Sequence, residues 1–506
     1  MTWQRLDPRM LAVTPLRLLA GFLPVIAVVV VLGVRQDVGW HVSGLLFGLL
    51  AVVLHGVLRW LTTRYRITSE RIELRSGLLV RSTRSVPRDR IRSVDITAGL
   101  GHRLFGLSVV RIGTGERTEG VESRELSLDA VSAAEADRVR QRLLDRPDIA
   151  ELVPGDARDP APDTATTLAD LDWSWLRFAP LTVSSLVAVG AVGGALWRFL
   201  NDLGVQPSDV ADLSGVRQQL SFAPLWLDVL VFAVALLVIA LLGSVLIFVE
   251  AWWGFRLIRE PGGTLRIRRG LFTSRSVSLE ERRLRGVEVV EPALLRVGRG
   301  ARTVAVATGL GGRRGHGRGA LLPPAPREEA HRVSGAVLAE RPSPTCAALH
   351  RHPVVALRRR LVRAVLPVLV GSGTLWLAGV PAWVAWATLG LLPVAVVLAV
   401  DSYRNLGHAL TRRYLVTRHG AGARGTVALQ RCGVIGWTVS QSLFQRRAGL
   451  VTVTATTAAG GGAYRVIDVR TADGLAVASQ AVPELLEPFL LHHDVVQRRV
   501  AGQGLG

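Results

Sequence analysis

The chain has 506 residues, of which 49% are hydrophobic, and it carries a formal net charge of +21 without a single lysine. Its mean hydropathy of +0.33 is too high for an ordinary soluble protein and indicates segments embedded in a bilayer. The two cysteines, Cys346 and Cys432, exclude a disulfide framework and a Cys-x-x-Cys metal site.

The apolar residues gather in three pairs of segments, which we interpret as six transmembrane helices. The predicted spans are residues 18–34, 40–58, 178–196, 225–249, 364–380 and 381–400. Each is about long enough to cross the hydrocarbon core of a bilayer. Arginine-rich flanks and an acidic loop at 201–219 predict that both termini and the segments between the pairs lie on the cytoplasmic side of a bacterial inner membrane.

A strand-rich unit follows each pair of apolar segments and occurs three times. In the first copy, residues 64–114, alternating apolar and polar residues predict β-hairpins, and Ser132 with Glu135 predicts a capped helix with the stripe Ala136, Val139, Leu143 and Leu144. In the second copy, Gly270 repeats Gly77 and RLRGV (283–287) repeats RIRSV (90–94), before one inserted residue. The third copy starts at Arg413-Tyr414, has RCGVI in place of RIRSV, and is predicted to have a shortened first hairpin.

These observations predict a chain in which membrane hairpins alternate with α+β domains. The predicted organisation is hairpin 1 at 1–62, domain 1 at 63–146, a linker at 147–172, hairpin 2 at 173–253, domain 2 at 254–340, a linker at 341–360, hairpin 3 at 361–403, domain 3 at 404–490 and a polar tail at 491–506.

The motifs resemble a known family. RYRIT followed by a GLL turn, SVPRDRIRSV, RLFGL and a capped helix is similar to the membrane-flanked bacterial pleckstrin-homology (PH) proteins, the YdbT-like family. The resemblance implies three PH-like domains, each a bent antiparallel sheet of about seven strands closed by a C-terminal helix, without enzymatic activity. It also implies a role in envelope stress or in resistance to membrane-active agents.

Arginines concentrate around the first hairpins and are the candidate anion-binding residues. They are Arg75, Arg81, Arg84, Arg88, Arg90 and Arg92 in the first copy and Arg268 and Arg269 in the second. Guanidinium groups bind phosphates in bidentate geometry, but the same residues on a solvated basic face attract an anionic bilayer without a pocket. Because these arginines are spread over several hairpins, we expect the diffuse field.

No motif indicates catalysis, a metal or a cofactor. The segment 113–120 lacks the lysine of a phosphate-binding loop, and His350 and His352 have no cysteine at metal-ligand spacing. No recognition helix or zinc finger indicates nucleic acid. The leading hypothesis is a non-enzymatic integral membrane scaffold that presents three cytoplasmic PH-like domains to anionic lipid head groups or to a membrane or cytoplasmic protein. The alternative is a transporter or lipid-handling protein that uses the six-helix bundle.

Overall fold

The computed structural model describes residues 3–11, 60–77, 81–113, 126–144, 165–182, 225–309 and 319–486, positions 69 and 92 excepted, and isolated positions between these ranges. The chain divides into two compact units. One comprises residues 1–176, 188–283 and 308–318, and the other comprises residues 177–187, 284–307 and 319–506. Because the boundary at 283/284 falls inside the second repeat, each unit holds one whole repeat and half of the second.

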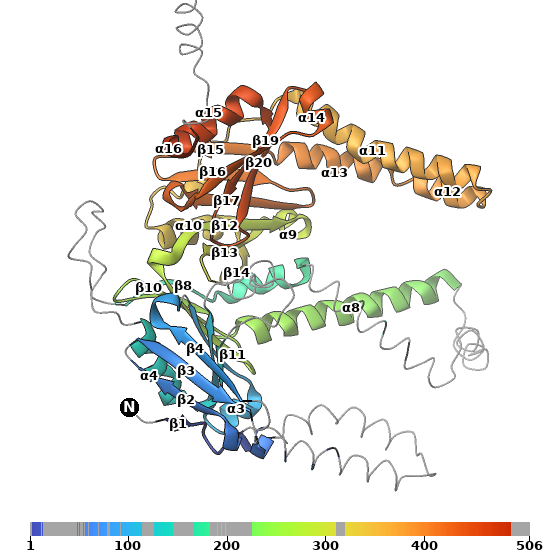
Figure 1. Cartoon of the computed structure of the whole chain (residues 1–506). Helices are drawn as coiled ribbons and strands as arrows, with labels where there is room; N and C mark the ends of the chain where they lie inside the picture. Colours follow the sequence, from blue (N-terminus) through green and yellow to red (C-terminus); the bar gives the residue numbers. More distant parts are fainter. Residues whose placement is uncertain are drawn as a thin grey trace, which may run out of the picture. The chain divides into compact units, whose positions relative to one another are not determined.

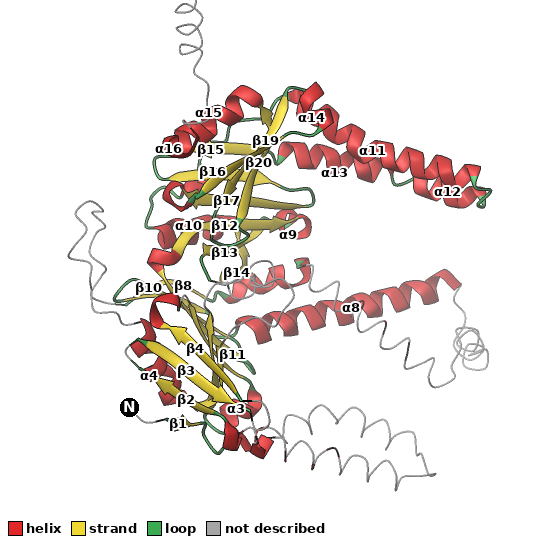
Figure 2. Cartoon of the chain, in the orientation of Figure 1, coloured by secondary structure: helices red, strands yellow, loops and turns green. Residues whose placement is uncertain are grey.

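Two antiparallel sheets build the first unit (Figure 1, Figure 2). The smaller has the order β1-β2-β3-β4 and the larger the order β7-β6-β5-β11-β10-β9-β8. The strands are β1 Gln4–Arg5, β2 Arg64–Ile67, β3 Arg71–Ser76, β4 Ser82–Pro87, β5 Ser93–Ala98, β6 Leu107–Gly113, β7 Leu126–Ser132, β8 Thr166–Asp170, β9 Arg256–Glu260, β10 Thr264–Arg269 and β11 Ser274–Glu280. The helices are η1 Arg88–Arg90, α3 Leu100–Leu104, α4 Ala133–Leu144, α8 Leu225–Trp252 and η4 Glu281–Arg283.

The second unit also has two antiparallel sheets, in the orders β14-β13-β12-β17-β16-β15 and β18-β19-β20. The strands are β12 Leu284–Pro292, β13 Gly300–Ala307, β14 Ala320–Pro326, β15 Gly407–Leu410, β16 Tyr414–His419, β17 Ala423–Gln430, β18 Gly436–Ser440, β19 Leu450–Thr456 and β20 Ala463–Arg470. The helices are α9 Ala293–Val297, α10 Arg327–Leu338, η6 Pro344–Cys346, α11 Val354–Leu377, α12 Ala382–Leu389, α13 Leu392–Arg404, η7 Arg431–Gly433, α14 Leu443–Arg447, α15 Thr471–Ala481 and α16 Pro483–Leu486.

A capped helix packs on the sheets of the first repeat as its sequence predicts. The backbone N–H of Glu135 donates to Ser132 Oγ over 3.3 Å and so starts α4. Ala136, Val139 and Leu143 are each at most 2% exposed and belong to one core with the strand residues of this repeat. Burying a side chain such as Leu143 stabilises the fold by roughly 1.5–3 kcal/mol, which is why the apolar stripe fixes the helix position.

The three repeats keep one spacing. The 3-10 turns η1, η4 and η7 end at residues 90, 283 and 433. Sixteen positions after each turn stands a residue with a positive φ: Gly106 (67°), Arg299 (56°) and Gly449 (63°). The insertion predicted in the second copy is therefore wrong. The turn glycines Gly77, Gly270 and Gly420 also agree, with φ of 104°, 106° and 129°. The hairpin of the third copy, β16–β17, is not shortened.

The prediction of six transmembrane helices is wrong. Among the described residues, one helix, Ala382–Arg404, is long and apolar enough to cross a membrane, and a shorter apolar helix covers Leu237–Trp252. The predicted fifth span, 364–380, is mostly the end of α11, which starts at Val354 and carries four arginines in its first three turns. Those charges leave too short an apolar stretch in α11 to cross the hydrocarbon core.

The other predicted spans have different outcomes. The segment 225–249 lies within α8, whereas 18–34, most of 40–58 and most of 178–196 lie outside the described residues. The start of the third predicted span belongs to the 3-10 helix η3, Trp173–Leu181. There Phe178 is 1% exposed and packs against Leu295 and Gly300, so it is a core residue of the second unit.

Candidate functional site

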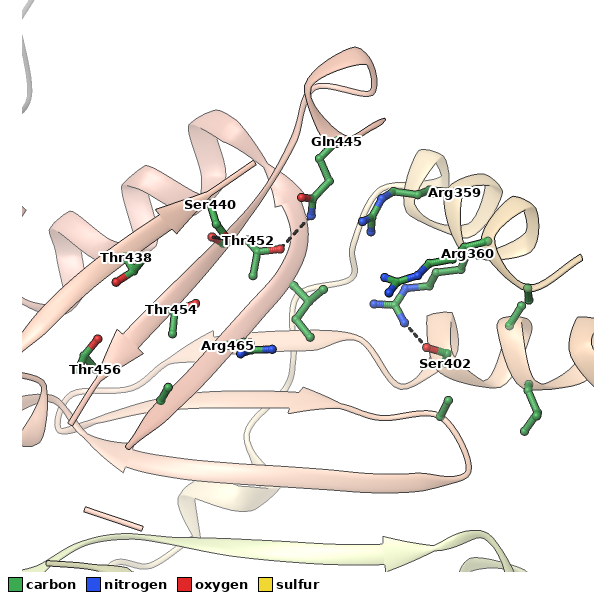
Figure 3. A pocket seen from close by; sticks show the side chains of 17 residues that line it. Arg359, Arg360, Ser402, Thr438, Ser440, Gln445, Thr452, Thr454, Thr456 and Arg465 are labelled. Atoms are coloured by element: carbon green, nitrogen blue, oxygen red, sulfur yellow. Dashed lines mark hydrogen bonds between the residues drawn. The ribbon is translucent and has the colours of Figure 1, made fainter. Parts of the chain in front are cut away.

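A basic cavity lies in the second unit between the first turns of α11, the last turns of α13 and the outer face of the β18-β19-β20 sheet (Figure 3). Its volume is about 790 Å³. Four arginines line this α11 cavity, together with serine and threonine hydroxyls and without an acidic side chain. The lining arginines are Arg359, Arg360, Arg363 and Arg465, and the hydroxyl-bearing residues are Ser402, Thr438, Ser440, Thr452, Thr454 and Thr456.

A buried carboxylate fixes α11 against this sheet. Asp468 is fully buried and accepts hydrogen bonds from Arg359 Nη1 at 2.5 Å, from Arg360 Nη2 at 3.1 Å and from Gln445 Nε2 at 2.9 Å. Its backbone φ of +59° places it at a bulge in β20, and Ala130 has a φ of 60° at the corresponding end of β7. The bulge thus turns a side chain toward the helix, and only the third repeat has a carboxylate there.

The remaining arginines of the α11 cavity are available to a ligand. Arg363 and Arg465 are exposed, and no acidic partner accompanies either side chain among the described residues. The buried Nε of Arg360 has no hydrogen-bond partner in the same described part of the chain. Planar guanidinium groups beside hydroxyl groups are the donors that bind phosphate oxygens. The lining has no carboxylate, imidazole or thiol that would act as a general base.

Three histidines lie close together beside the anchor of α11. His352 Nε2 and His408 Nδ1 are 3.0 Å apart, and the rings of His350 and His408 have centroids 5.7 Å apart. Burial, and to a lesser extent the two neighbouring histidines, lowers the pKa of His408 to about 4. The pKa of His352 is also lowered, by burial, against hydrogen bonds to backbone carbonyls. Among the described residues, no group of three or more histidine, cysteine or acidic side chains is placed to hold a metal ion, and this cluster is no exception.

A second basic cavity, of about 450 Å³, lies in the first unit beside the end of α8. This α8 cavity contains Arg268 and Arg269 from the predicted set. Arg103, Arg266 and Arg275 accompany them. Arg269 stacks on Trp252 at 4.3 Å, and burial lowers its pKa to about 10. Arg266 is neutralised by Glu260 and Asp137 at 3.1 Å each. The α8 cavity is smaller than the α11 cavity, and its lining includes an acidic side chain, Asp137.

Carboxylates attach a helix to a hairpin turn in both units. Glu250 in the last turn of α8 accepts hydrogen bonds from the backbone N–H groups of Phe272 and Thr273, at 2.8 and 3.1 Å. In the second unit, Asp401 near the end of α13 accepts from Arg296 at 2.6 Å and from the N–H of Gly422 at 3.3 Å. Each helix is therefore held in a fixed direction relative to the sheet that it precedes.

A short helix with exposed apolar side chains recurs at one position in every repeat. It begins ten positions after the 3-10 turn and includes basic residues. The exposed side chains are Leu100 and Leu104 in α3, Leu294 and Val297 in α9, and Leu443 and Phe444 in α14, with exposures of 41–84%. Arg103 of α3 lines the α8 cavity beside Trp253, and Gln445 of α14 lines the α11 cavity. In both cases the short helix lies next to the end of a long apolar helix.

The arginines predicted in the first repeat do not form one site. Arg75 stacks on Trp3 at 4.3 Å, and Arg81, just before the outer strand β4, and Arg84, within it, are exposed. Arg88 donates to the carbonyl of Arg142 at the end of α4, just as Arg431 donates to the last carbonyls of α15, so it acts as a helix cap. Arg90 is exposed, and Arg92 lies outside the described residues.

The sequence reasoning missed the arginines of the α11 cavity. It treated the cluster at 358–360 as a topology signal, although helical spacing brings Arg359, Arg360 and Arg363 to one end of α11. Arg465 alternates with Val466 in β20, and such alternation was the available signal for an outward-facing residue.

Comparison with known proteins agrees with this architecture. Residues 14–147 and 364–481 match the family model described as Bacterial PH domain, and these segments include the first and third repeats. The chain is 24% identical over 416 residues to the UPF0699 transmembrane protein YdbT of Bacillus subtilis (strain 168), which covers 79% of this chain and 81% of the relative. No solved structure matches. The chain is therefore a membrane-associated member of the bacterial PH domain family.

Proposed function

We propose that this protein is a non-enzymatic membrane scaffold that holds its PH-like repeats against the bilayer and binds the phosphate of anionic lipid head groups in the α11 cavity. The observation that carries the proposal is the lining of that cavity, with four arginines and no acidic side chain at the end of the apolar helix Ala382–Arg404. Ser402, which lines the cavity, is two positions from the end of that helix. A ligand there would lie at the level of the head groups.

The recurrent short helices support an orientation with the repeats at the membrane surface. Each places exposed leucine, valine or phenylalanine beside arginine or histidine, a combination typical of segments that enter the interface between head groups and acyl chains. The arginines at 358–360 and Arg404 flank the apolar helices on the side of the repeats. Positive residues in such flanks favour the cytoplasm, so we place the repeats there, in a bacterial inner membrane.

A scaffold of this kind would respond to the charge of the inner leaflet. Agents that disturb the bilayer change the access of anionic head groups, and this suits the role in envelope stress or resistance that the family resemblance implies. The residues of the α11 cavity offer donors and positive charge but no nucleophile with a base, which is why we propose binding without chemistry.

The test uses the full-length protein in zwitterionic detergent, with short-chain phosphatidylglycerol, short-chain phosphatidylcholine, glycerol phosphate and inorganic phosphate as separate ligands. The doubly substituted variant Arg363→Gln/Arg465→Gln removes two charged donors without breaking an ion pair of the described residues. At about 1.5 kcal/mol for each charged hydrogen bond, or about 3 kcal/mol for the two, the affinity for phosphatidylglycerol should fall by roughly 100-fold.

The matched control is Arg412→Gln, an exposed arginine between β15 and β16 that does not line the cavity. It should change the affinity less than twofold. If inorganic phosphate bound as tightly as phosphatidylglycerol, the ligand of the cavity would be a soluble anion rather than a lipid. Equal affinity for phosphatidylcholine, or equal losses in the two variants, would contradict the proposed site.

A further inference from the structure

Neighbouring repeats are joined by strand pairing. The strand β5 of the first repeat pairs antiparallel with β11 of the second, and β12 of the second pairs antiparallel with β17 of the third. In the first joint Val94 lies opposite Ser278, and in the second joint Val287 lies opposite Ala428.

The two joints have the same register. Val94 and Val287 each stand four positions after the last residue of a 3-10 turn, Arg90 or Arg283. Their partners Ser278 and Ala428 each stand three positions before the first residue of the next such turn. Equivalent atoms therefore make both joints, and the joint is a property of the repeat rather than of one pair of sequences.

The first and third repeats each have one strand of the kind that forms this joint, and among the described residues that strand pairs with no other repeat. The strand β4 of the first repeat corresponds to β11 and β17, and β18 of the third repeat corresponds to β5 and β12. Both are edge strands among the described residues. Five of the six residues of β4 are exposed, and β18 has no buried residue, whereas β11 and β17 each bury four. Ile435 before β18 and Val439 within it are 62% and 43% exposed.

We propose that β18 of one molecule pairs antiparallel with β4 of a second copy, so that the repeats continue from chain to chain. Transferring the register of the internal joints places Trp437 opposite Ser85 and Val439 opposite Thr83. The two edges are complementary halves of a joint that the chain already makes twice, which is why a second copy is the partner. Two different surfaces meet, so the contact is heterologous and head to tail.

The edges are also protected against less specific pairing. Arg84 in β4 occupies the position of Val277 in β11, and exposed charges on an edge strand oppose indiscriminate addition of other strands. Confinement of both copies to one membrane raises their effective concentration, so a joint of modest intrinsic strength is sufficient.

Cysteine cross-linking of full-length protein in membranes tests the register. The exposed Cys346 and Cys432 are first replaced by serine. Two differently tagged versions, one with Thr83→Cys and one with Val439→Cys, are then co-expressed and mildly oxidised. A mixed disulfide dimer is expected, at least fivefold more abundant than that from Ser85→Cys with Val439→Cys, which is two residues out of register on the same face.

A second experiment disrupts the proposed contact with a substitution outside the hydrophobic core. Wild-type protein in mild detergent should have a mass above that of the monomer by light scattering. Val439→Asp, at an exposed position, should be monomeric with an unchanged unfolding temperature. Equal cross-linking in and out of register would overturn the proposal. A monomeric wild type would also overturn the proposal. So would a single chain carrying both Thr83→Cys and Val439→Cys that forms only an intramolecular disulfide.

Discussion

Replacement of Asp468 by alanine should strongly destabilise the second unit. The carboxylate is fully buried and neutralises Arg359 and Arg360, whose side chains are only 18% and 16% exposed. Removing one partner of a buried ion pair costs about 3–5 kcal/mol, because the opposite charge stays behind without compensation. We expect the low end, about 3 kcal/mol, since water in the adjoining α11 cavity can solvate the two guanidinium groups.

Backbone strain at position 468 does not add to this loss of stability. Ala130 occupies the corresponding bulge of the first repeat with nearly the same φ, so alanine is compatible with the conformation of Asp468. For a folding unit of about 200 residues, 3 kcal/mol lowers the unfolding temperature by roughly 6–12 °C. The measurement is tryptophan fluorescence during thermal unfolding of the full chain in detergent.

The matched control is Glu329→Gln, which breaks the pair with Arg332, whose side chain is 55% exposed. Exposed pairs of this kind contribute about 0–1 kcal/mol. Asp468→Asn keeps hydrogen-bond acceptors but loses the charge, and should fall between the two variants. If Asp468→Ala cost no more than Glu329→Gln, the reasoning that this carboxylate anchors α11 would be refuted.

Three further predictions concern other positions. His408 is buried and its pKa is lowered to about 4, so the unfolded state binds more protons between about pH 4 and 6.5; stability should fall by up to about 3 kcal/mol as the pH drops through this window, and His408→Gln should flatten the unfolding temperature against pH. A Cβ at Gly420 would lie 1.8 Å from a backbone carbonyl oxygen at a φ of +129°, so Gly420→Ala should cost about 2–3 kcal/mol by thermal unfolding while Gly461→Ala, with open space, costs less than about 1. Glu250→Ala should leave two amide groups of the β10–β11 turn without acceptors, and hydrogen exchange at Phe272 should accelerate by at least tenfold; an unchanged rate would show that α8 is held by other contacts.

Local features of the repeats followed from sequence because they depend on short-range rules. The turn glycines Gly77 and Gly270 need a positive φ, and the spacing of Ser132 and Glu135 starts a helix wherever it occurs. The apolar stripe of α10 was predictable for the same reason: Ala330, Val333, Val337 and Leu338 are all buried.

The arrangement of the strands was not accessible in the same way. Alternation in Ser93–Ala98 predicts a strand, but nothing local tells it to pair with Ser274–Glu280, which is far away in the sequence. The same limit applies to the α11 cavity, whose arginines come from a helix and from a strand a hundred residues later. The transmembrane span predicted at 364–380 is wrong for a similar reason. Its apolar stretch belongs to α11, a longer helix that begins with arginines, and hydropathy alone does not show where a helix starts.

The strand joints also determine which pieces of this chain behave as independent proteins. A fragment cut to the second repeat alone, residues 254–340, would contain β9–β11 and β12–β14 but neither β5 nor β17. Both halves would then present bare sheet edges, and such a fragment would aggregate rather than fold. A single cut between Arg283 and Leu284 would also fail, because residues 177–187, with the buried Phe178, belong to the second unit. Calorimetry of the whole chain should accordingly resolve two cooperative melting steps for its three repeats.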